Sequence, residues 1–318
     1  MTVNSTLSSL SYFILEAYID LGTLQYFYFA ITLTVYTAIV VVNILLIVLI
    51  CLNRTLREPM YMFLCSLFMN EVYGSSSLFP FLLVQILSDI HAVAAPFCFL
   101  QIFCFYSYVN IEFCNLAIMS YDRYLAICCP LKYNSVMTFS RAGLFVVLIW
   151  LYSSVRCIIN ICLSLRLTLC GNVLSSLFCH NYLIVKLACV DTELNNIFGL
   201  FSTTLSVLVP LLPIIYSYAK ILSICFSASS KMRQKAASTC MPHLASLLNF
   251  AFGCLFEILQ TRFDMTSVPN ALRFFLSLYF GILQPLLNPI IFGMRMSKIR
   301  NIFKDFLHKK KTADILKC

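Results

Sequence analysis

The feature that most constrains the fold is a long apolar stretch from Cys98 to Cys128. It contains one acid, Glu112, before it ends in an acid–base pair, Asp122 and Arg123. An α-helix rises about 1.5 Å per residue, so a helix of this length more than crosses a hydrocarbon core about 30 Å thick. The stretch therefore predicts a tilted membrane-spanning helix whose charged end lies at a water boundary.

The composition extends this interpretation to the whole chain. The 318 residues are 61% hydrophobic and 11% charged, and the mean hydropathy is +0.89. These values are typical of a polytopic membrane protein and exclude a water-soluble domain. No cleavable signal peptide is apparent, because Met1 to Tyr12 lacks the required order of basic, apolar and small residues.

Six further apolar stretches predict spans at about 27–51, 59–87, 141–162, 195–222, 236–259 and 272–292. The expected fold class is an all-α membrane protein, a seven-transmembrane helix bundle. From Ser297 to Leu307, apolar residues recur at helical spacing among basic ones, which predicts a short C-terminal amphipathic helix on an anionic leaflet. We expect one domain over 1–318, with an extracellular N-terminus (1–25), a helix bundle (26–293) and a cytoplasmic tail (294–318).

The distribution of basic residues predicts the orientation. With the N-terminus outside, all but five of the 22 Lys and Arg residues fall in cytoplasmic segments, as the positive-inside rule requires. We expect a multi-pass plasma-membrane protein with an extracellular N-terminus, in which the triplet Asn4-Ser5-Thr6 makes Asn4 a glycosylation acceptor. The net charge of +9 then reflects membrane topology and lipid contact, and no nucleic-acid partner is expected. The five exceptions are Arg156, Arg166, Lys186, Arg262 and Arg273.

Four of the sixteen cysteines lie in predicted outer segments: Cys98, Cys170, Cys179 and Cys189. The outer side of the membrane is oxidising, so disulfides can form there. Four cysteines allow three pairings, and the sequence alone does not choose between them.

Five motifs in order along the chain resemble a single family. They are PMYMFLCSL from Pro59, MSYDRYLAICCPLKY from Met119, Ser217-Tyr218, KAASTCMPHL from Lys235 and PLLNPIIF from Pro285. Together they cover nearly the whole chain and resemble the odorant (olfactory) receptors of the rhodopsin-like G-protein-coupled family.

Five departures from the family pattern indicate a divergent branch, for which a non-mammalian origin is one interpretation. The family usually has glycine at position 42, aspartate at 71, alanine at 120, phenylalanine at 237 and tyrosine at 292. Because Phe292 has no hydroxyl, any activation switch that needs a hydroxyl at this position stays open. The five residues are Val42, Glu71, Ser120, Ala237 and Phe292.

The resemblance implies a receptor that binds small, mostly apolar odorants in an outer transmembrane pocket. It also implies activation of a heterotrimeric G protein of the Gs/olf type, which raises cyclic AMP. For many of the implied pocket residues, ordinary helix packing is the alternative role. Arg262 could bind an acidic ligand, but Glu257 and Asp264 are nearby acids with which it could pair instead. The implied pocket residues are Phe105, Tyr106, Val109, Asn110, Ser202, Ser206, Phe252, Leu255, Ile258, Arg262 and Phe274.

An activation switch is also implied. Arg123 held by Asp122 would form a latch, because removing one partner of a buried ion pair costs about 3–5 kcal/mol; two ordinary boundary charges are the alternative. Asn288-Pro289 interrupts the seventh helix as either a hinge or a passive kink, and His243 is either part of the switch or a buried imidazole. The implied switch residues are Asp122, Arg123, Tyr124, Tyr218, His243, Asn288 and Pro289.

Two acids near mid-membrane, Glu71 and Glu112, need compensation. The resemblance implies a sodium ion held by these acids with Asn43 and Asn288; the alternative is that both acids are protonated and hydrogen-bonded. No other metal or cofactor is expected. For the outer cysteines the resemblance implies the disulfides Cys98–Cys179 and Cys170–Cys189, with free thiols as the alternative.

The sequence offers no support for an enzyme, since it lacks metal-ligand, nucleophile-elbow and phosphate-loop motifs. Buried acids and broken helices also mark ion channels and secondary transporters, but the chain has no internal repeat and its basic residues concentrate on one face. A lipid or hormone receptor of the same fold is a further alternative. Arg156, in the outer half of the fourth span, either snorkels to the surface or faces the bundle.

Overall fold

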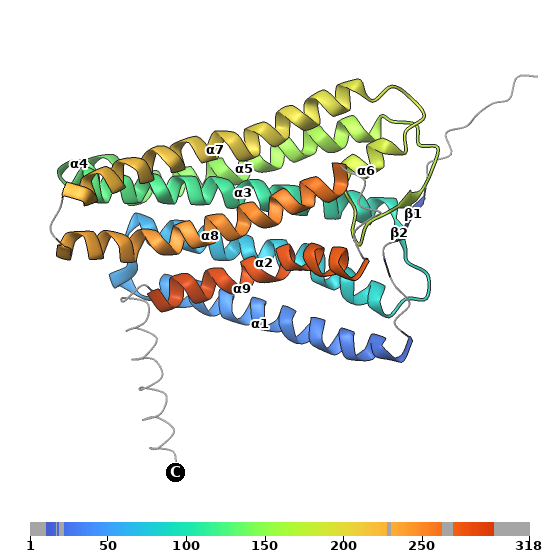
Figure 1. The fold of residues 1–318 in the computed structure, drawn as a ribbon, viewed down its shortest axis with the longest axis horizontal. Coiled ribbons are helices and arrows are strands. Elements are labelled where there is room, and N and C mark those ends of the chain that lie inside the picture. The colour runs from blue at the N-terminus through green and yellow to red at the C-terminus, as the bar shows by residue number, and fades with distance from the viewer. Residues whose placement is uncertain (1–10, 17, 19–21, 228–229, 263–269, 296–318) are drawn as a thin grey trace, which may run out of the picture.

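The computed structural model describes residues 11–16, 18, 22–227, 230–262 and 270–295. Within these residues, seven long helices lie side by side in one bundle, as Figure 1 shows, and each corresponds to one predicted span. The predicted seven-helix fold class is confirmed. The helices are α1 (Gln25–Leu52), α2 (Pro59–Ile86), α3 (Ala95–Cys128), α5 (Phe139–Leu165), α7 (Glu193–Ser227), α8 (Ser230–Arg262) and α9 (Asn270–Arg295).

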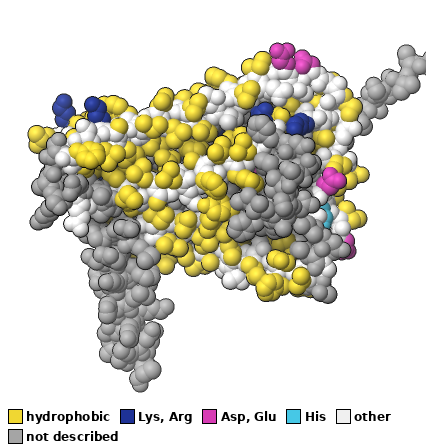
Figure 2. Space-filling model, in the orientation of Figure 1, with side chains coloured by type: hydrophobic (Ala, Val, Ile, Leu, Met, Phe, Trp, Pro, Cys, Tyr) yellow, Lys and Arg dark blue, Asp and Glu magenta, His cyan; other side chains and the backbone are white. Residues whose placement is uncertain are grey.

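Length and composition allow five of these helices to cross a membrane: α1, α3, α5, α7 as far as Phe226, and Cys240–Leu259 of α8. Helix α2 is equally long but less apolar, because it carries Ser66, Asn70 and Glu71, which are all buried against other helices. In Figure 2, hydrophobic side chains cover the middle of the visible face and charged ones lie toward its two ends. This is the surface expected of a bundle whose solvent is lipid.

Helix α3 lies at the centre of the bundle, where it contacts α2, α5, α7 and α8. It lies close to α2 at Gly74, where an added Cβ atom would overlap the ring of Tyr108. Because Gly74 leaves this space, the Tyr108 hydroxyl reaches across and donates a hydrogen bond to Glu71 over 3.1 Å. Helix packing thus places a hydroxyl beside a buried acid.

One end of the bundle carries a small sheet that the sequence did not predict. The strands β1 (Tyr12–Leu15), β2 (Ala92–Ala94) and β3 (Val173–Leu174) form a sheet in the order β2-β1-β3. Strand β1 is antiparallel to β2 and parallel to β3. The sheet buries Phe13 and Leu15 against the start of α3, so part of the segment before the first helix belongs to the packed structure.

The same end contains α6 (Asn181–Lys186) and two disulfides, Cys98–Cys179 and Cys170–Cys189, each with a Cα–Cα distance of 5.5 Å. These are the two pairs that the resemblance implied. We call this the disulfide end and the opposite end, which carries Asp122 and Arg123, the Arg123 end.

Three boundaries differ from the sequence-based expectation. The expected inner loop after the third span contains α4 (Pro130–Val136), and the expected long outer loop contains β3 and α6. The basic segment Lys231–Lys235, expected as a link, belongs to α8, because its Lys, Met, Arg and Gln residues favour helix and no glycine or proline interrupts them. Asn4 and the amphipathic helix expected at Ser297–Leu307 lie outside the described residues.

Short 3-10 helices complete the described elements. η1 (Gly22–Leu24) precedes α1, and η2 (Arg54–Leu56) connects α1 to α2. Pro59 begins α2 at its first turn, where the missing N–H of proline costs no helical hydrogen bond.

Candidate functional site

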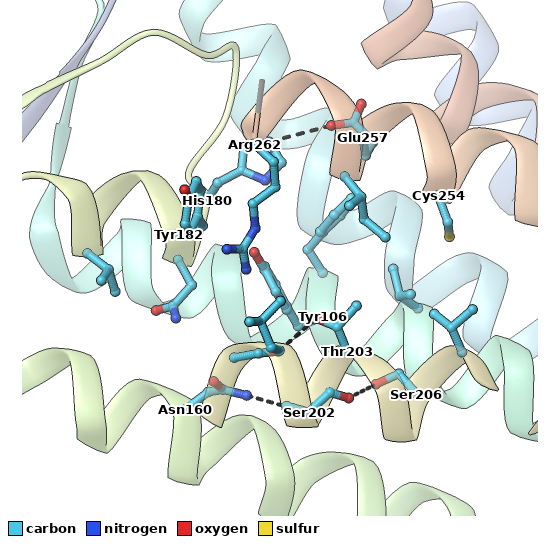
Figure 3. Close-up of a pocket in the computed structure, with 18 of the residues that line it drawn as sticks. Tyr106, Asn160, His180, Tyr182, Ser202, Thr203, Ser206, Cys254, Glu257 and Arg262 are labelled. Atoms are coloured by element: carbon cyan, nitrogen blue, oxygen red, sulfur yellow. Dashed lines mark hydrogen bonds and ion pairs between the residues drawn. The ribbon is translucent and has the colours of Figure 1, made fainter. Parts of the chain in front are cut away.

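A cavity of about 360 Å³ lies at the disulfide end between α3, α5, α6, α7 and α8. Figure 3 shows two facing walls: Asn160, Ser202 and Ser206 lie on one, and His180 and Glu257 lie on the other. The lining is mixed, with aliphatic and aromatic side chains between hydroxyl, amide and charged groups. Pockets of this size and character commonly hold small organic molecules.

Most of the predicted pocket residues line this cavity. They are Phe105, Tyr106, Val109, Ser202, Ser206, Ile258 and Arg262. The agreement follows from helical periodicity, because residues three or four positions apart on one helix share a face.

Three predicted pocket residues lie elsewhere, which corrects the sequence-based assignment. Asn110 is buried beside α5, where its amide donates to the Ser153 hydroxyl over 2.6 Å. Phe252 and Leu255 are each 56% exposed on the outer surface of α8. The cavity side of α8 is formed instead by Cys254, Glu257, Ile258 and Arg262. The side chain of Phe274 lies outside the described residues.

The prediction missed residues of three kinds. Continuing the spacing of Ser202 and Ser206 along α7 would have identified Asn195, Gly199 and Thr203. The residues of α6 and its preceding segment, His180 to Tyr182, reach the cavity only because the Cys98–Cys179 disulfide holds this segment against α3. On α5 and α8, Arg156, Asn160, Cys254 and Glu257 gave a weaker signal, the presence of polar or charged residues within apolar spans.

Arg156 faces the bundle and does not snorkel. It is 8% exposed, and its Nη1 donates to the Ser202 carbonyl over 2.5 Å, to the Ser202 hydroxyl over 2.9 Å and to the Ser206 hydroxyl. Asn160, one turn further along α5, also donates to the Ser202 hydroxyl over 3.1 Å. These bonds connect α5 to α7 along one cavity wall.

The opposite wall pairs a histidine with an acid. His180 Nε2 lies 3.6 Å from a Glu257 carboxylate oxygen, and the His180 ring packs against Phe178 with centroids 4.5 Å apart. Arg262 lies over the Tyr182 ring at 3.8 Å, a cation–π contact. The expected pairing of Arg262 with Glu257 was not found among the described residues, where the Glu257 carboxylate faces His180 and Arg262 faces the Tyr182 ring. Asp264 lies outside the described residues.

A second cluster, deeper in the bundle, brings the two predicted acids together. Asn288 donates to both, to Glu112 over 2.9 Å and to Glu71. Glu112 also accepts hydrogen bonds from Asn70 over 2.9 Å and from Gln284 over 3.1 Å. Three helices, α2, α3 and α9, thus share one hydrogen-bond network around two carboxyl groups.

Asn43 makes no hydrogen bond to either acid, and its side-chain oxygen is buried without a hydrogen-bond partner among the described residues. Its amide donates to the backbone carbonyls of Ile39 over 2.9 Å and Pro285 over 3.0 Å, and so connects α1 to α9. Ser246, which was not predicted, takes part in the network: its hydroxyl donates to Asn288 over 2.7 Å and accepts from Gln284 over 3.1 Å.

At the Arg123 end, Arg123 forms an ion pair with Asp122, and its Nε donates to the same carboxylate over 3.0 Å. The Tyr133 hydroxyl of α4 donates to the other Asp122 oxygen over 2.8 Å. Asp122 is fully buried, so the pair is not merely two boundary charges in water.

The other predicted switch residues are divided between two places, because Asn288 belongs to the acid cluster. Tyr124 packs against Tyr216, and His243 meets the Phe292 ring edge to face at 5.1 Å. The ring contact at Phe292 replaces any hydrogen bond a tyrosine would make there. Tyr218 and Pro289 are buried, in α7 and α9 respectively.

Comparison with known proteins identifies the family. The olfactory receptor family model matches residues 32–310. Olfactory receptor 2K2 of Homo sapiens is 32% identical over 94% of this chain and 94% of its own length. Olfactory receptor 4B13 of Mus musculus is 32% identical over 87% of this chain and 89% of its own, and olfactory receptor 52D1 of Homo sapiens is 33% identical over 87% and 88%.

This chain belongs to the olfactory receptor family. It is a membrane receptor and not an enzyme. The family assignment from five sequence motifs is confirmed.

The cavity of this receptor contains a histidine whose protonation is suppressed by its surroundings. His180 is buried among Phe105, Phe178 and the carboxyl group of Glu257. Although the carboxylate lies 3.6 Å away, burial dominates and lowers the pKa of His180 from 6.5 to about 4.

We expect mild acid to destabilise the receptor through His180. Below pH 6.5 the His180 imidazole is protonated in the unfolded chain, whereas in the folded chain it stays neutral until about pH 4. The stabilising contribution is therefore complete above pH 6.5 and is lost as the pH falls, by up to about 1.4 kcal/mol per pH unit. The thermal midpoint of purified receptor should fall more between pH 7 and pH 5 in the wild type than in His180→Gln. Equal decreases in the two proteins would contradict this.

Proposed function

We propose that the receptor binds a small, mostly apolar odorant in the cavity at the disulfide end and then activates a heterotrimeric G protein of the Gs/olf type, which raises cyclic AMP. The observation that carries this proposal is the cavity itself, about 360 Å³ in volume and walled by α3, α5, α7 and α8. Apolar side chains such as Val109, Val207 and Ile258 supply its hydrophobic surface, and hydroxyls and amides supply a few directional contacts.

We further propose that the disulfide end is extracellular, in the plasma membrane, and that the Arg123 end is cytoplasmic. Two observations support this orientation. Both disulfides belong to one end of the bundle, as an oxidising compartment requires. The basic residues of the sequence concentrate in the segments at the other end, which the positive-inside rule favours for the cytoplasm.

In the proposed mechanism, the odorant acts by binding one conformation more tightly than the other. In the conformation described here, Asp122 holds Arg123 and is itself held by Tyr133. Activation would release Arg123 and move the cytoplasmic end of α8 outward, admitting the C-terminus of a Gα subunit. Among the described residues the Tyr218 hydroxyl has no hydrogen-bond partner, so it is available to hold the freed arginine.

We also propose that a sodium ion binds at the acid cluster and stabilises this conformation. The cluster offers two carboxyl groups and the Ser246 hydroxyl, and such oxygens are the ligands that hard cations prefer. Glu71, Glu112, Ser246 and Asn288 would hold the ion in this proposal. Asn43 is a further candidate ligand, because its buried side-chain oxygen has no hydrogen-bond partner among the described residues.

The odorant site is tested by filling the cavity. We expect Ile258→Trp to raise the odorant concentration needed for half-maximal cyclic AMP by about tenfold or more, because overfilling a packed site costs about 1–3 kcal/mol. Leu255→Trp is the matched control, since Leu255 lies one turn away on the outer surface of α8. The measurement is a cyclic AMP reporter response to a broad odorant panel, at equal surface expression. If both variants respond like the wild type, the cavity is not the odorant site.

The latch is tested at Arg123. Arg123→Ala should reduce odorant-stimulated cyclic AMP by at least about tenfold, because the residue that Tyr218 is proposed to hold in the active conformation is lost. Surface labelling must show that the variant reaches the plasma membrane. A correctly delivered variant that signals normally would refute the latch.

The sodium site is tested by stability. Replacing choline chloride with sodium chloride at equal ionic strength should raise the thermal midpoint of the purified wild-type receptor, because a ligand that binds only the folded state stabilises it. Glu112→Gln should abolish this increase. Asn43→Ala should reduce it less than Glu112→Gln does, because Asn43 carries no charge and makes no hydrogen bond to either acid. The site is wrong if Glu112→Gln responds to sodium as the wild type does.

A further inference from the structure

Arg156 is a buried cation that no acid of the described chain compensates. Among the described residues Arg123 forms an ion pair with Asp122, and the Glu257 carboxylate lies beside the neutral His180 ring. No carboxylate of these residues lies within ion-pair distance of Arg156. Its Nη1 binds only neutral oxygens, and its Nε has no hydrogen-bond partner among the described residues. The residue is nevertheless buried, with only 8% of its surface exposed.

Connecting α5 to α7 does not explain why this residue is charged. Asn160 already makes such a connection to the Ser202 hydroxyl with a neutral amide. A charge within a membrane-spanning helix is expensive, and arginines found there pair with anions or line a cavity. Arg156 does line the cavity, so its missing counter-charge can come from a bound molecule.

The charges around the cavity are unbalanced in the direction that favours an anion. The charged lining residues are Arg156, Arg262 and Glu257. Glu257 lies with His180 on the wall opposite Ser202 and Ser206, as Figure 3 shows, and Arg262 is covered by the Tyr182 ring. The wall of Arg156 therefore carries an excess positive charge, and the negative charge lies across the cavity from it.

We propose that the odorant carries a carboxylate, which Arg156 binds from the wall between α5 and α7. A guanidinium presents N–H donors in a planar fork that matches a carboxylate. The apolar part of the ligand would lie along Val109 and Val207, which line the same cavity. This inference rests on the proposed function, because it requires the cavity to be the odorant site.

The experiment compares ligands that differ in charge but not in carbon skeleton. Straight-chain carboxylic acids of graded length are tested beside their methyl esters and primary alcohols, on cells expressing the full-length receptor with a cyclic AMP reporter. The receptors are the wild type, Arg156→Gln, Arg156→Lys and Arg262→Gln, each with surface labelling. Arg156→Gln keeps hydrogen-bond donors but removes the charge, and Arg262→Gln removes the other cavity arginine.

We expect the acids to give a half-maximal cyclic AMP response in the wild type at concentrations at least about tenfold lower than the esters and alcohols do. This is the size of effect that one or two hydrogen bonds to a charged group produce. Arg156→Gln should abolish this preference while retaining the ester response. Arg156→Lys should retain part of it, and Arg262→Gln should leave it intact. If Arg156→Gln does not reach the surface, the acid-to-ester preference of the wild type decides.

Two results would overturn the inference and are distinguishable from failure of the cavity itself. Esters or alcohols that match or exceed the acids on the wild type, or an unchanged acid preference in Arg156→Gln, would make Arg156 a structural connection while the odorant site stands. If Ile258→Trp responds to the acids, esters and alcohols as the wild type does, the cavity is not the odorant site. The proposed carboxylate site would then be wrong as well.

Discussion

The structure depends on one constraint: a polar group inside the bundle must find its partner inside the protein, because hydrocarbon supplies none. Glu112 shows how the fold meets it. From the central helix α3 it accepts hydrogen bonds from Asn70 of α2 and from Gln284 and Asn288 of α9. Each of these bonds fixes the rotation of one helix against α3. The network therefore specifies how three helices pack, which apolar contacts alone specify weakly in lipid.

The same helix places the functional groups in a line. Cys98 anchors the disulfide end, Tyr106 lines the cavity, Glu112 holds the polar cluster, and Asp122 ends the series at Arg123. At about 1.5 Å per residue, the cavity lies roughly 9 Å from the cluster, and the cluster roughly 15 Å from the ion pair. A rotation or shift of α3 in response to a ligand would alter all of these contacts at once, which is the physical basis for coupling the two ends.

Sequence reasoning succeeded where the determining signal is local. Hydropathy located each span because a bilayer imposes a minimum length on an apolar helix, and helical spacing placed Ser202, Ser206 and Ile258 on one cavity. It failed where the signal is tertiary. The strand Val173–Leu174 is too short to have a pattern, and His180 reaches the cavity only through a disulfide distant in sequence. Phe252 was misplaced because identifying the cavity side of α8 requires knowing which neighbours pack against it.

The treatment of charge divides the buried groups into two kinds. The carboxyl groups of Glu71 and Glu112 are surrounded by donors from Asn70, Tyr108, Gln284 and Asn288, so the protein itself supplies most of their compensation. Among the described residues, Arg156 is surrounded by oxygens that carry no formal charge, and its Nε has no hydrogen-bond partner. The bundle thus surrounds the two carboxyl groups with hydrogen-bond donors but gives the arginine only neutral acceptors. The difference coincides with location, because the acids lie in packed protein and the arginine lines a cavity. Incomplete compensation is tolerable where a ligand can complete it, and there it becomes a source of specificity.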